Sequence, residues 1–393
     1  MKIIIRAIQL LVGALFIFSG FVKAVDPLGT SYKMHDYFNA FSNDFPSLDF
    51  LWHFMSNSST FWAVFMLVFE LAIGFALLIG WRHKITLWLM LLLCLFFTLL
   101  TGYTYLSGYS FDSFFAFSTW KFDATKMKVT NCGCFGDFMK LTPRTSYWKD
   151  IVLDVLIIIM LLGKKHLYTL LKEKVATITV ALVTVGSLFF CFSNYLWGLP
   201  IIDFRPYKIG TNLPQAMAMT DSVVMKFIYK KEGKEIALDM DQLKTIDSTY
   251  TYVDRQDIVF ENPKKIVGFF INTPDGNNIA DSLLQAPHLF LLIAYDLEKT
   301  RTKIFPAIND FANLCTQAQI PFVALTHTDP VATERFRHEH QNPFPFYFAD
   351  EVPLKTMIRS NPGLIYLQQG TVKAMWHASQ LPAFDQVKTN LIH

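Results

Sequence analysis

Charged residues are scarce in this chain of 393 residues: they make up 17% of it, whereas 52% of its residues are hydrophobic. A chain this apolar is not an ordinary soluble enzyme of its length, and its composition also excludes a disordered, collagen-like or coiled-coil protein. The 35 Lys and Arg residues are nearly balanced by 32 Asp and Glu residues. They form no dense basic cluster, so nucleic-acid binding is excluded.

Cysteine is scarce as well. Five cysteines are too few for a disulfide-stapled scaffold, and only Cys132 and Cys134 lie close together in the sequence. This pair is the main clue to function.

What the sequence does contain is apolar runs long enough to cross a bilayer, which takes roughly 20 residues in a helix. We predict five membrane helices, over residues 3–25, 61–81, 85–106, 148–163 and 175–197. The first run also resembles a signal peptide, because Lys2 and Arg6 precede it. Lys23 is a poor neighbour for a cleavage site, however, and further runs follow, so a retained helix is favoured. The fourth run is short and contains Asp154.

The short connections rich in Lys and Arg predict the orientation, because such connections stay in the cytoplasm. They are residues 1–6, 81–84 and 164–174. We therefore expect a multi-pass protein of the inner (cytoplasmic) membrane with a cytoplasmic N-terminus. With five spans, everything after Trp197 lies outside, in the periplasm of a cell with two membranes. The two outer loops, about residues 26–59 and 107–147, share that compartment.

Cys132 and Cys134 stand in the second outer loop with only Gly133 between them. Two such thiols in an oxidising compartment tend to pair, and glycine permits the backbone angles that so short a ring needs. Strain in that ring raises its reduction potential, which favours an electron acceptor over an inert staple. A structural clip remains an alternative. A metal site lacks ligands, since His35 and His53 lie in another loop without finger-like spacing.

Two charged residues fall within the predicted spans. Glu70 lies in the middle of the second span, where an ionised carboxylate is costly and usually faces a partner or a polar cavity. Lys23, near the outer end of the first span, is its candidate partner, with a structural tie and a proton-handling or ligand role both open. Asp154 is expected to reach the headgroups. Cys94 and Cys191 are expected to be small core residues.

Three stretches together resemble the DoxX/MauE-type membrane family over roughly residues 1–165. They are residues 15–27, the step from Glu70 to Gly74, and the Cys132–Asp137 segment. Long forms with a soluble tail, as found in Bacteroidota, are particularly similar. The resemblance implies a four-helix membrane bundle, here with a fifth transmembrane helix added. In the MauE branch it also implies a supporting role in maturing a disulfide-containing periplasmic enzyme.

The second half has the composition of a soluble domain. A linker and a small strand-rich segment, around residues 223–236, are predicted within 198–262. From about residue 263, buried strands at 289–295 and 321–326 alternate with helices at 304–317 and 332–339, after a hairpin at 267–276. A closing hairpin turns at Gln369 and Gly370. The expected domains are therefore 1–165, 175–197, 198–262 and 263–393.

This strand and helix order, with Asn361-Pro362 before the closing hairpin, resembles a soluble α/β thioredoxin-like domain. Aligning Pro306 with the family's helix proline puts the two redox-thiol positions at Glu298 and Arg301, so both thiols are missing. Pro362 fits the family's cis-proline, which contacts substrates. Cys315 lies in a predicted helix and is expected to be packed.

The leading hypothesis is a membrane-anchored accessory protein in extracytoplasmic thiol redox or protein maturation, with Cys132 and Cys134 as an exchangeable disulfide. Its partner is a periplasmic thiol or disulfide protein, which the tail positions through Pro362. A quinone is a candidate oxidant, although no cofactor signature is visible. The alternative is a non-catalytic envelope binding or assembly protein with a structural disulfide. Transport is disfavoured, because few polar groups lie in the spans.

Overall fold

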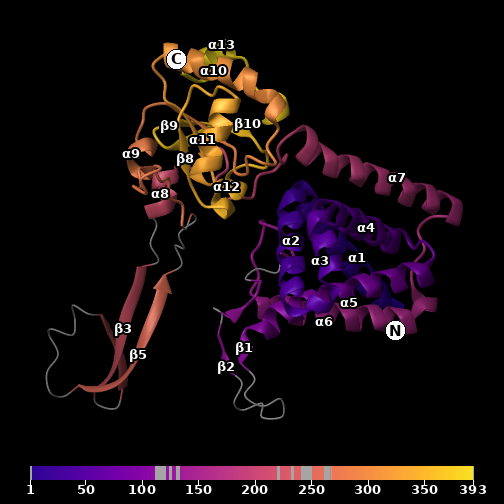
Figure 1. The fold of residues 1–393 in the computed structure, drawn as a ribbon. Coiled ribbons are helices and arrows are strands. Elements are labelled where there is room, and N and C mark those ends of the chain that lie inside the picture. Colours follow the sequence, from indigo (N-terminus) through magenta and orange to yellow (C-terminus); the bar gives the residue numbers. More distant parts are fainter. Residues whose placement is uncertain are drawn as a thin grey trace. The chain divides into compact units, whose positions relative to one another are not determined.

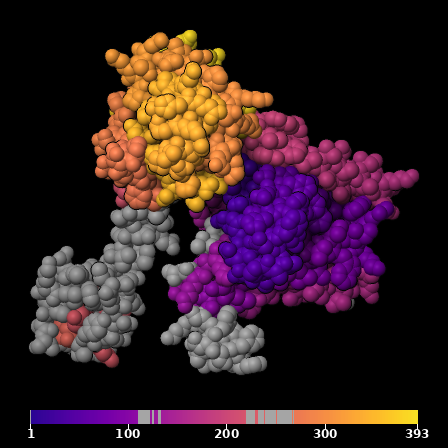
Figure 2. Space-filling model, in the orientation of Figure 1, coloured from indigo at the N-terminus to yellow at the C-terminus, as the bar shows by residue number. Residues whose placement is uncertain are grey.

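The computed structural model describes two compact units, Met1–Arg205 and Pro206–His393. Figure 1 shows the helices of the first unit, which begin in indigo, and the helices and larger sheet of the second unit, which end in yellow; Figure 2 draws the chain in space-filling form. The residues described are 2–110, 121–123, 126–129, 133–218, 222–231, 234–239, 250–260, 266 and 268–392. Cys132 lies outside them.

Four helices of the first unit are long and apolar enough to cross a membrane. They are α1 (Lys2–Val25), α4 (Ser59–Ile79), α5 (His83–Ser107) and α7 (Glu173–Phe192), which continues through a π-helical turn to Trp197. Each matches a span predicted from the sequence.

The predicted span at 148–163 forms helix α6 (Pro143–Leu162). It contains too many charged residues to count among the four apolar helices. Helix α6 nevertheless runs the length of the bundle beside α5. Its C-terminal end, at Gly163, lies against Ile5 in the first turns of α1. Near its other end, the Lys149 ammonium lies 5.8 Å from the ring centre of Phe135, in the segment that covers the last turn of α1.

Small residues let α1 and α4 approach closely, as is common where membrane helices pack. A Cβ atom added at Gly74 would lie 3.1 Å from a side-chain carbon of Ile17, and one at Gly20 would lie 3.0 Å from Leu71. The core of the bundle then fills with apolar side chains from α1, α4, α5 and α6, among them Val12, Leu77, Leu87, Met90 and Ile157.

The sequence predicted a loop over about 26–59, but the structure folds this connection into helices α2 (Pro27–Asp44) and α3 (Asp49–Asn57), joined by a 3-10 turn (Pro46–Leu48). Helix α2 starts sharply because Asp26 accepts a hydrogen bond from the Gly29 backbone and Pro27 occupies the first turn. It is too polar to span a membrane, yet one face, with Met34 and Phe38, is buried against α4 and α5.

The second unit contains two sheets. A three-stranded antiparallel sheet has the order β4-β3-β5, with β3 (Ser222–Lys231), β4 (Lys234–Asp239) and β5 (Thr251–Phe260). The β3–β4 hairpin matches the predicted strand-rich stretch, whereas β5 was not predicted.

The larger sheet has the order β10-β9-β6-β7-β8. Strand β6 (Leu289–Ile293) pairs in parallel with β7 (Phe322–Thr326), which pairs in parallel with β8 (Phe346–Phe348). On the other side of β6, the antiparallel hairpin of β9 (Gly363–Gln368) and β10 (Thr371–His377) completes the sheet. Both central strands, β6 and β7, are buried along their whole length, as the continuous apolar runs predicted.

Helices α10 (Phe305–Gln317) and α11 (Pro330–Glu339) follow β6 and β7, as predicted from the sequence. At the hairpin predicted over 267–276, the described residues form a turn closed by an isolated bridge between Asn272 and Asn278 and by a backbone hydrogen bond from Ile279 to Ile271. The remaining helices are α8 (Leu213–Ala218), α9 (Ala280–Leu284), α12 (Glu351–Met357) and α13 (Phe384–Val387).

Gly80 ends α4 in the left-handed region, at φ 74°, where a Cβ atom would lie 2.4 Å from the Tyr168 carbonyl oxygen. Gly80→Ala should therefore lower the free energy of unfolding by about 1–3 kcal/mol. Thermal unfolding in detergent micelles measures this. The matched control is Gly186→Ala in α7, where a Cβ atom meets nothing within 4 Å. Equal stability of the two variants would contradict this packing.

Candidate functional site

The segment around Cys134 is fixed to the end of the bundle where α1 stops and α6 begins, here called the Cys134 end. Gly133 has φ 63°, the left-handed conformation that favours glycine between the two cysteines. The Ser19 hydroxyl donates a 3.0 Å hydrogen bond to the Cys134 carbonyl. The rings of Phe135 and Phe138 lie 6.1 Å and 5.5 Å from that of Phe18, measured between centroids.

Cys134 carries a free thiol that is partly buried. Burial raises the pKa of this thiol, the Lys149 ammonium opposes that rise, and the Asp150 carboxylate adds to it. Ser146 and Lys23 also favour the thiolate. The Ser146 hydroxyl is buried and has no hydrogen-bond partner of its own in the described part of the chain, so it is available as a donor to the thiolate.

Below this segment, Lys23 and Glu70 form a buried ion pair, with 2.5 Å between Nζ and Oε2. The two residues are 7% and 2% exposed. Lys23 starts nearer the end of the bundle than Glu70, but its long side chain reaches inward and its ammonium lies 4.9 Å from the ring centre of Phe97. A Cβ atom at Gly136 would lie 3.9 Å from Lys23 Cγ, so the Cys134 segment lies against the aliphatic part of Lys23.

A polar seam continues inward between α5 and α6. Thr101 donates a 2.9 Å hydrogen bond to the Asp150 carboxylate, and Thr98 donates one of 2.7 Å to Asp154. Asp150 also pairs with Lys149. The thiol of Cys94 lies 3.8 Å from the Asp150 carbonyl oxygen.

One expectation about this region is wrong, and several residues of the polar seam were not predicted. Asp154 does not reach the headgroups: it is buried in the bundle, and its Oδ1 atom has no partner among the described residues. Cys94 and Cys191 are buried free thiols, as expected. The missed signal was the spacing of Ser146, Asp150 and Asp154, which at four-residue intervals lie on one face of a helix.

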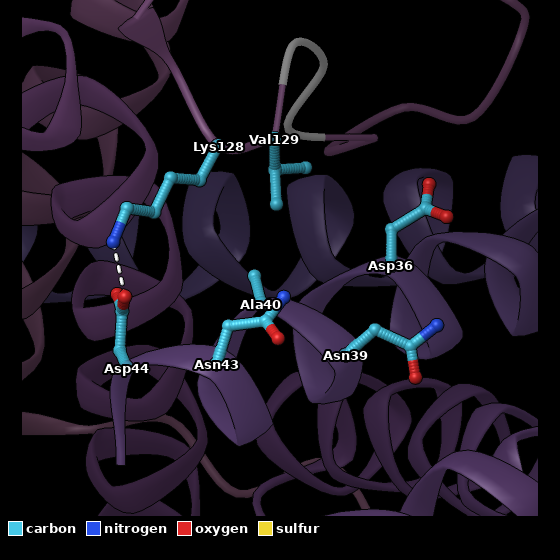
Figure 3. Close-up of a pocket in the computed structure, with 7 residues that line it drawn as sticks. All are labelled: Asp36, Asn39, Ala40, Asn43, Asp44, Lys128 and Val129. Carbon is cyan, nitrogen blue, oxygen red and sulfur yellow. Dashed lines mark hydrogen bonds and ion pairs between the residues drawn. The ribbon is translucent and has the colours of Figure 1, made fainter. Parts of the chain in front are cut away.

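A polar hollow of about 470 Å³ lies beside the segment that leads to the cysteines. Figure 3 shows Asp44 of α2 paired with Lys128, next to Val129. Tyr103 donates a second hydrogen bond to Asp44, and these two partners hold the pKa of that carboxyl below its usual range. The polar face of α2 supplies the rest of the lining, with Asp36, Asn39, Ala40 and Asn43.

Within the described residues, no group of three or more His, Cys, Asp or Glu side chains is placed to hold a metal ion.

In the second unit, the Asn361–Pro362 peptide bond is cis. The Arg301 backbone donates a 3.1 Å hydrogen bond to the Asn361 carbonyl, so this loop lies against the segment that contains Glu298 and Arg301. Cys315 is buried in the core of the unit, as expected. Burial lowers the pKa of His377 to about 4, and the charge of Arg301 adds to this, so its imidazole is neutral at pH 7.

Glu70→Gln should lower the free energy of unfolding by about 3–5 kcal/mol, because it leaves the buried Lys23 ammonium without its counter-charge. The double variant Lys23→Met/Glu70→Leu should recover most of this loss. Thermal unfolding in detergent micelles measures both. Asp36→Asn is the control: its 3.7 Å pair with Lys33 is half exposed, and its loss should cost less than about 1 kcal/mol. A Glu70→Gln variant as stable as the parent would contradict the pair's role.

Comparison with known proteins gives two family matches. Residues 1–112 match the family described as methylamine utilisation protein MauE. Residues 223–262, which cover strands β3 to β5, match a domain of unknown function (DUF8463). No curated protein matches the chain. The MauE match and the apolar helices together show a multi-pass membrane protein whose N-terminal region is similar to MauE.

Proposed function

We propose that this protein is a membrane-anchored accessory in extracytoplasmic thiol redox, in which Cys132 and Cys134 form an exchangeable disulfide. The observation that carries the proposal is the setting of Cys134. Its thiol lies at the end of an apolar bundle with a charged lysine, a buried hydroxyl and a buried ion pair beside it. Charged and hydroxyl side chains are uncommon inside membrane bundles and tend to mark functional sites, so their gathering at one thiol favours exchange over an inert clip.

The reaction is an exchange of two electrons. A thiolate of a reduced partner attacks one sulfur of the Cys132–Cys134 disulfide, and the S–S bond breaks as a mixed disulfide forms. The partner's second thiolate then attacks the mixed disulfide. The partner leaves with a disulfide, the chain gains two thiols, and the two protons pass from the partner's thiols to Cys132 and Cys134.

The setting of Cys134 favours an internal role for this residue: it leaves as a thiolate when the partner attacks Cys132, and in the reverse direction it displaces the partner from Cys132. Its thiol is partly buried, which keeps foreign thiols away, and its raised pKa makes it a strong nucleophile once it is deprotonated. Lys149 and Ser146 are placed to stabilise that thiolate. We therefore assign the contact with the partner to Cys132. Re-oxidation of the two thiols to a disulfide requires an oxidant such as a quinone, which would leave as a quinol.

The path of α6 supports the proposed orientation. We propose that α6, which runs the length of the bundle, is a fifth crossing, so that the chain leaves α7 on the side of the membrane where Cys134 lies. The ring of Phe204, just before the second unit, lies 5.2 Å from that of Phe138 at the Cys134 end. With the N-terminus in the cytoplasm, as the Lys and Arg distribution predicts, both lie in the periplasm.

A thioredoxin-like identity for residues 263–393 is part of this proposal. The strand order β10-β9-β6-β7, with β6 parallel to β7 and a closing antiparallel hairpin, supports it. So does the hydrogen bond of Arg301 to Asn361, because it joins the expected thiol position to the proline loop. Without thiols at Glu298 and Arg301, this unit would position a partner, through Pro362, instead of exchanging disulfides.

The reactivity of Cys134 should depend on pH in a defined way. In a Cys132→Ser variant, the raised pKa keeps Cys134 protonated near pH 8, so its alkylation by iodoacetamide should keep accelerating above the range of an ordinary thiol. Adding Lys149→Met should raise the pKa further and slow alkylation at a fixed pH by about threefold or more. Adding Asp150→Asn should lower the pKa and speed alkylation. Mass spectrometry of the Cys134 peptide follows all three, and equal rates would contradict the assigned environment.

The exchange itself is tested by trapping in cells. In Cys134→Ser, the Cys132 thiolate can attack the disulfide of an oxidised partner, one partner sulfur leaves as a thiolate, and without Cys134 to displace the partner this mixed disulfide should accumulate as a reducible adduct on a non-reducing gel. Cys132→Ser is the matched control and should trap far less. Thiol labelling of the unaltered chain should find both cysteines outside the cytoplasm and at least partly oxidised.

Absence of any adduct, together with unchanged disulfide content of periplasmic proteins when both cysteines are serine, would remove the redox proposal. If a stable partner is still captured with the double serine variant, the chain is the binding or assembly protein of the alternative hypothesis.

A further inference from the structure

Helix α3 (Asp49–Asn57) divides into three sectors, because successive residues turn by about 100° around its axis. One sector is apolar and exposed: Phe50, Leu51 and Phe54 are 88%, 43% and 57% exposed. So large an exposed aromatic surface on one short helix calls for something to cover it.

The second sector fixes the helix to the bundle. The ring of Trp52 lies 5.2 Å from that of Phe41 in α2, and Met55 packs on the same cluster. Ser56 donates a 2.7 Å hydrogen bond to Asn39. These contacts hold α3 in place, so it cannot turn its apolar sector inward.

The third sector is polar. Asp49 and His53, four residues apart, lie 3.4 Å from each other, and both are exposed. Asn57 is exposed on the same edge. A polar edge beside an apolar sector is the pattern of a helix that lies between water and lipid.

Helix α3 leads directly into α4, whose first turns expose aromatic side chains on the surface that this span presents to the membrane. Ser58 alone separates α3 from α4. The first turns of α4 expose Phe61 and Phe65, whose rings stack at 6.5 Å, and Phe69 continues the row at 5.9 Å. The row of aromatic rings on this span therefore leads directly to α3.

We propose that α3 lies flat in the headgroup layer of the membrane, at the Cys134 end, with Phe50, Leu51 and Phe54 directed toward the acyl chains. The occupant of this surface is the phospholipid bilayer, because α3 leads directly into a membrane-spanning helix and its apolar sector offers no hydrogen-bonding side chain to a protein partner. Burial of aromatic and aliphatic side chains provides the free energy of this contact. It would set the depth of the bundle and hold the polar hollow beside α2 at the membrane surface.

Photo-crosslinking of the full chain tests this contact. Phe50→benzoylphenylalanine places a photoreactive group in the apolar sector without removing an aromatic side chain. The protein is reconstituted in vesicles of phosphatidylethanolamine and phosphatidylglycerol and irradiated, and mass spectrometry of its peptides reports what position 50 captures. We expect phospholipid adducts.

The matched control is His53→benzoylphenylalanine, which is on the polar edge of the same helix and is also exposed. Its yield of lipid adduct should be several-fold lower than that of position 50. Equal lipid yields at both positions would overturn the proposal, since they would mean contact with lipid irrespective of the sector. Capture by position 50 of a peptide from the second unit, or from a second copy of the chain, would also overturn it. None of these outcomes depends on whether Cys132 and Cys134 exchange electrons.

Discussion

The buried ion pair between Lys23 and Glu70 is the constraint on which the Cys134 end depends. An isolated charge in an apolar bundle is expensive, so each of these residues is tolerable only because the other lies 2.5 Å away. The pair fixes the last turns of α1 against the middle of α4, and Gly136 of the Cys134 segment lies against the aliphatic part of Lys23. The position of Lys23, and with it the surface that Gly136 contacts, is therefore set by the ion pair with Glu70.

The same cost of burying polar groups explains the seam between α5 and α6. Asp150 and Asp154 are acceptable in the bundle because threonine hydroxyls of α5 face them. A purely apolar α6 would pack equally well and would meet the usual composition of a membrane span. Helix α6 instead carries Lys149 and Asp150 near Cys134, so the polar seam extends to the Cys134 segment.

The apolar spans could be predicted from sequence because run length and composition decide them. The buried strands of β6 and β7 and the closing hairpin were predictable for a similar reason. The folding of 26–59 into α2 and α3 was not, because α2 is held by tertiary burial of one face and not by its overall hydropathy. Strand β5 was missed because its alternation includes charged residues such as Asp254 and Arg255.

At the candidate site, the residue types were predictable and the neighbours were not. Lys23 could be named as the partner of Glu70, but nothing in its position showed that its side chain reaches inward past Phe97. Lys149 and Ser146 come to Cys134 from the start of another helix, so only the path of the chain reveals them. The four-residue spacing of Ser146, Asp150 and Asp154 was the one local signal. It predicts that these side chains share a face of α6, but it does not predict which residues that face contacts.

The contact of Phe204 with Phe138 means that the chain leaves the bundle beside its cysteine segment. If the second unit binds a partner, as proposed, the partner's encounter with Cys134 becomes intramolecular. Effective concentrations of about millimolar are typical of short tethers. At such a concentration, the tethered partner would not need a high affinity for the bundle itself, because weak and brief contacts would recur often enough for exchange.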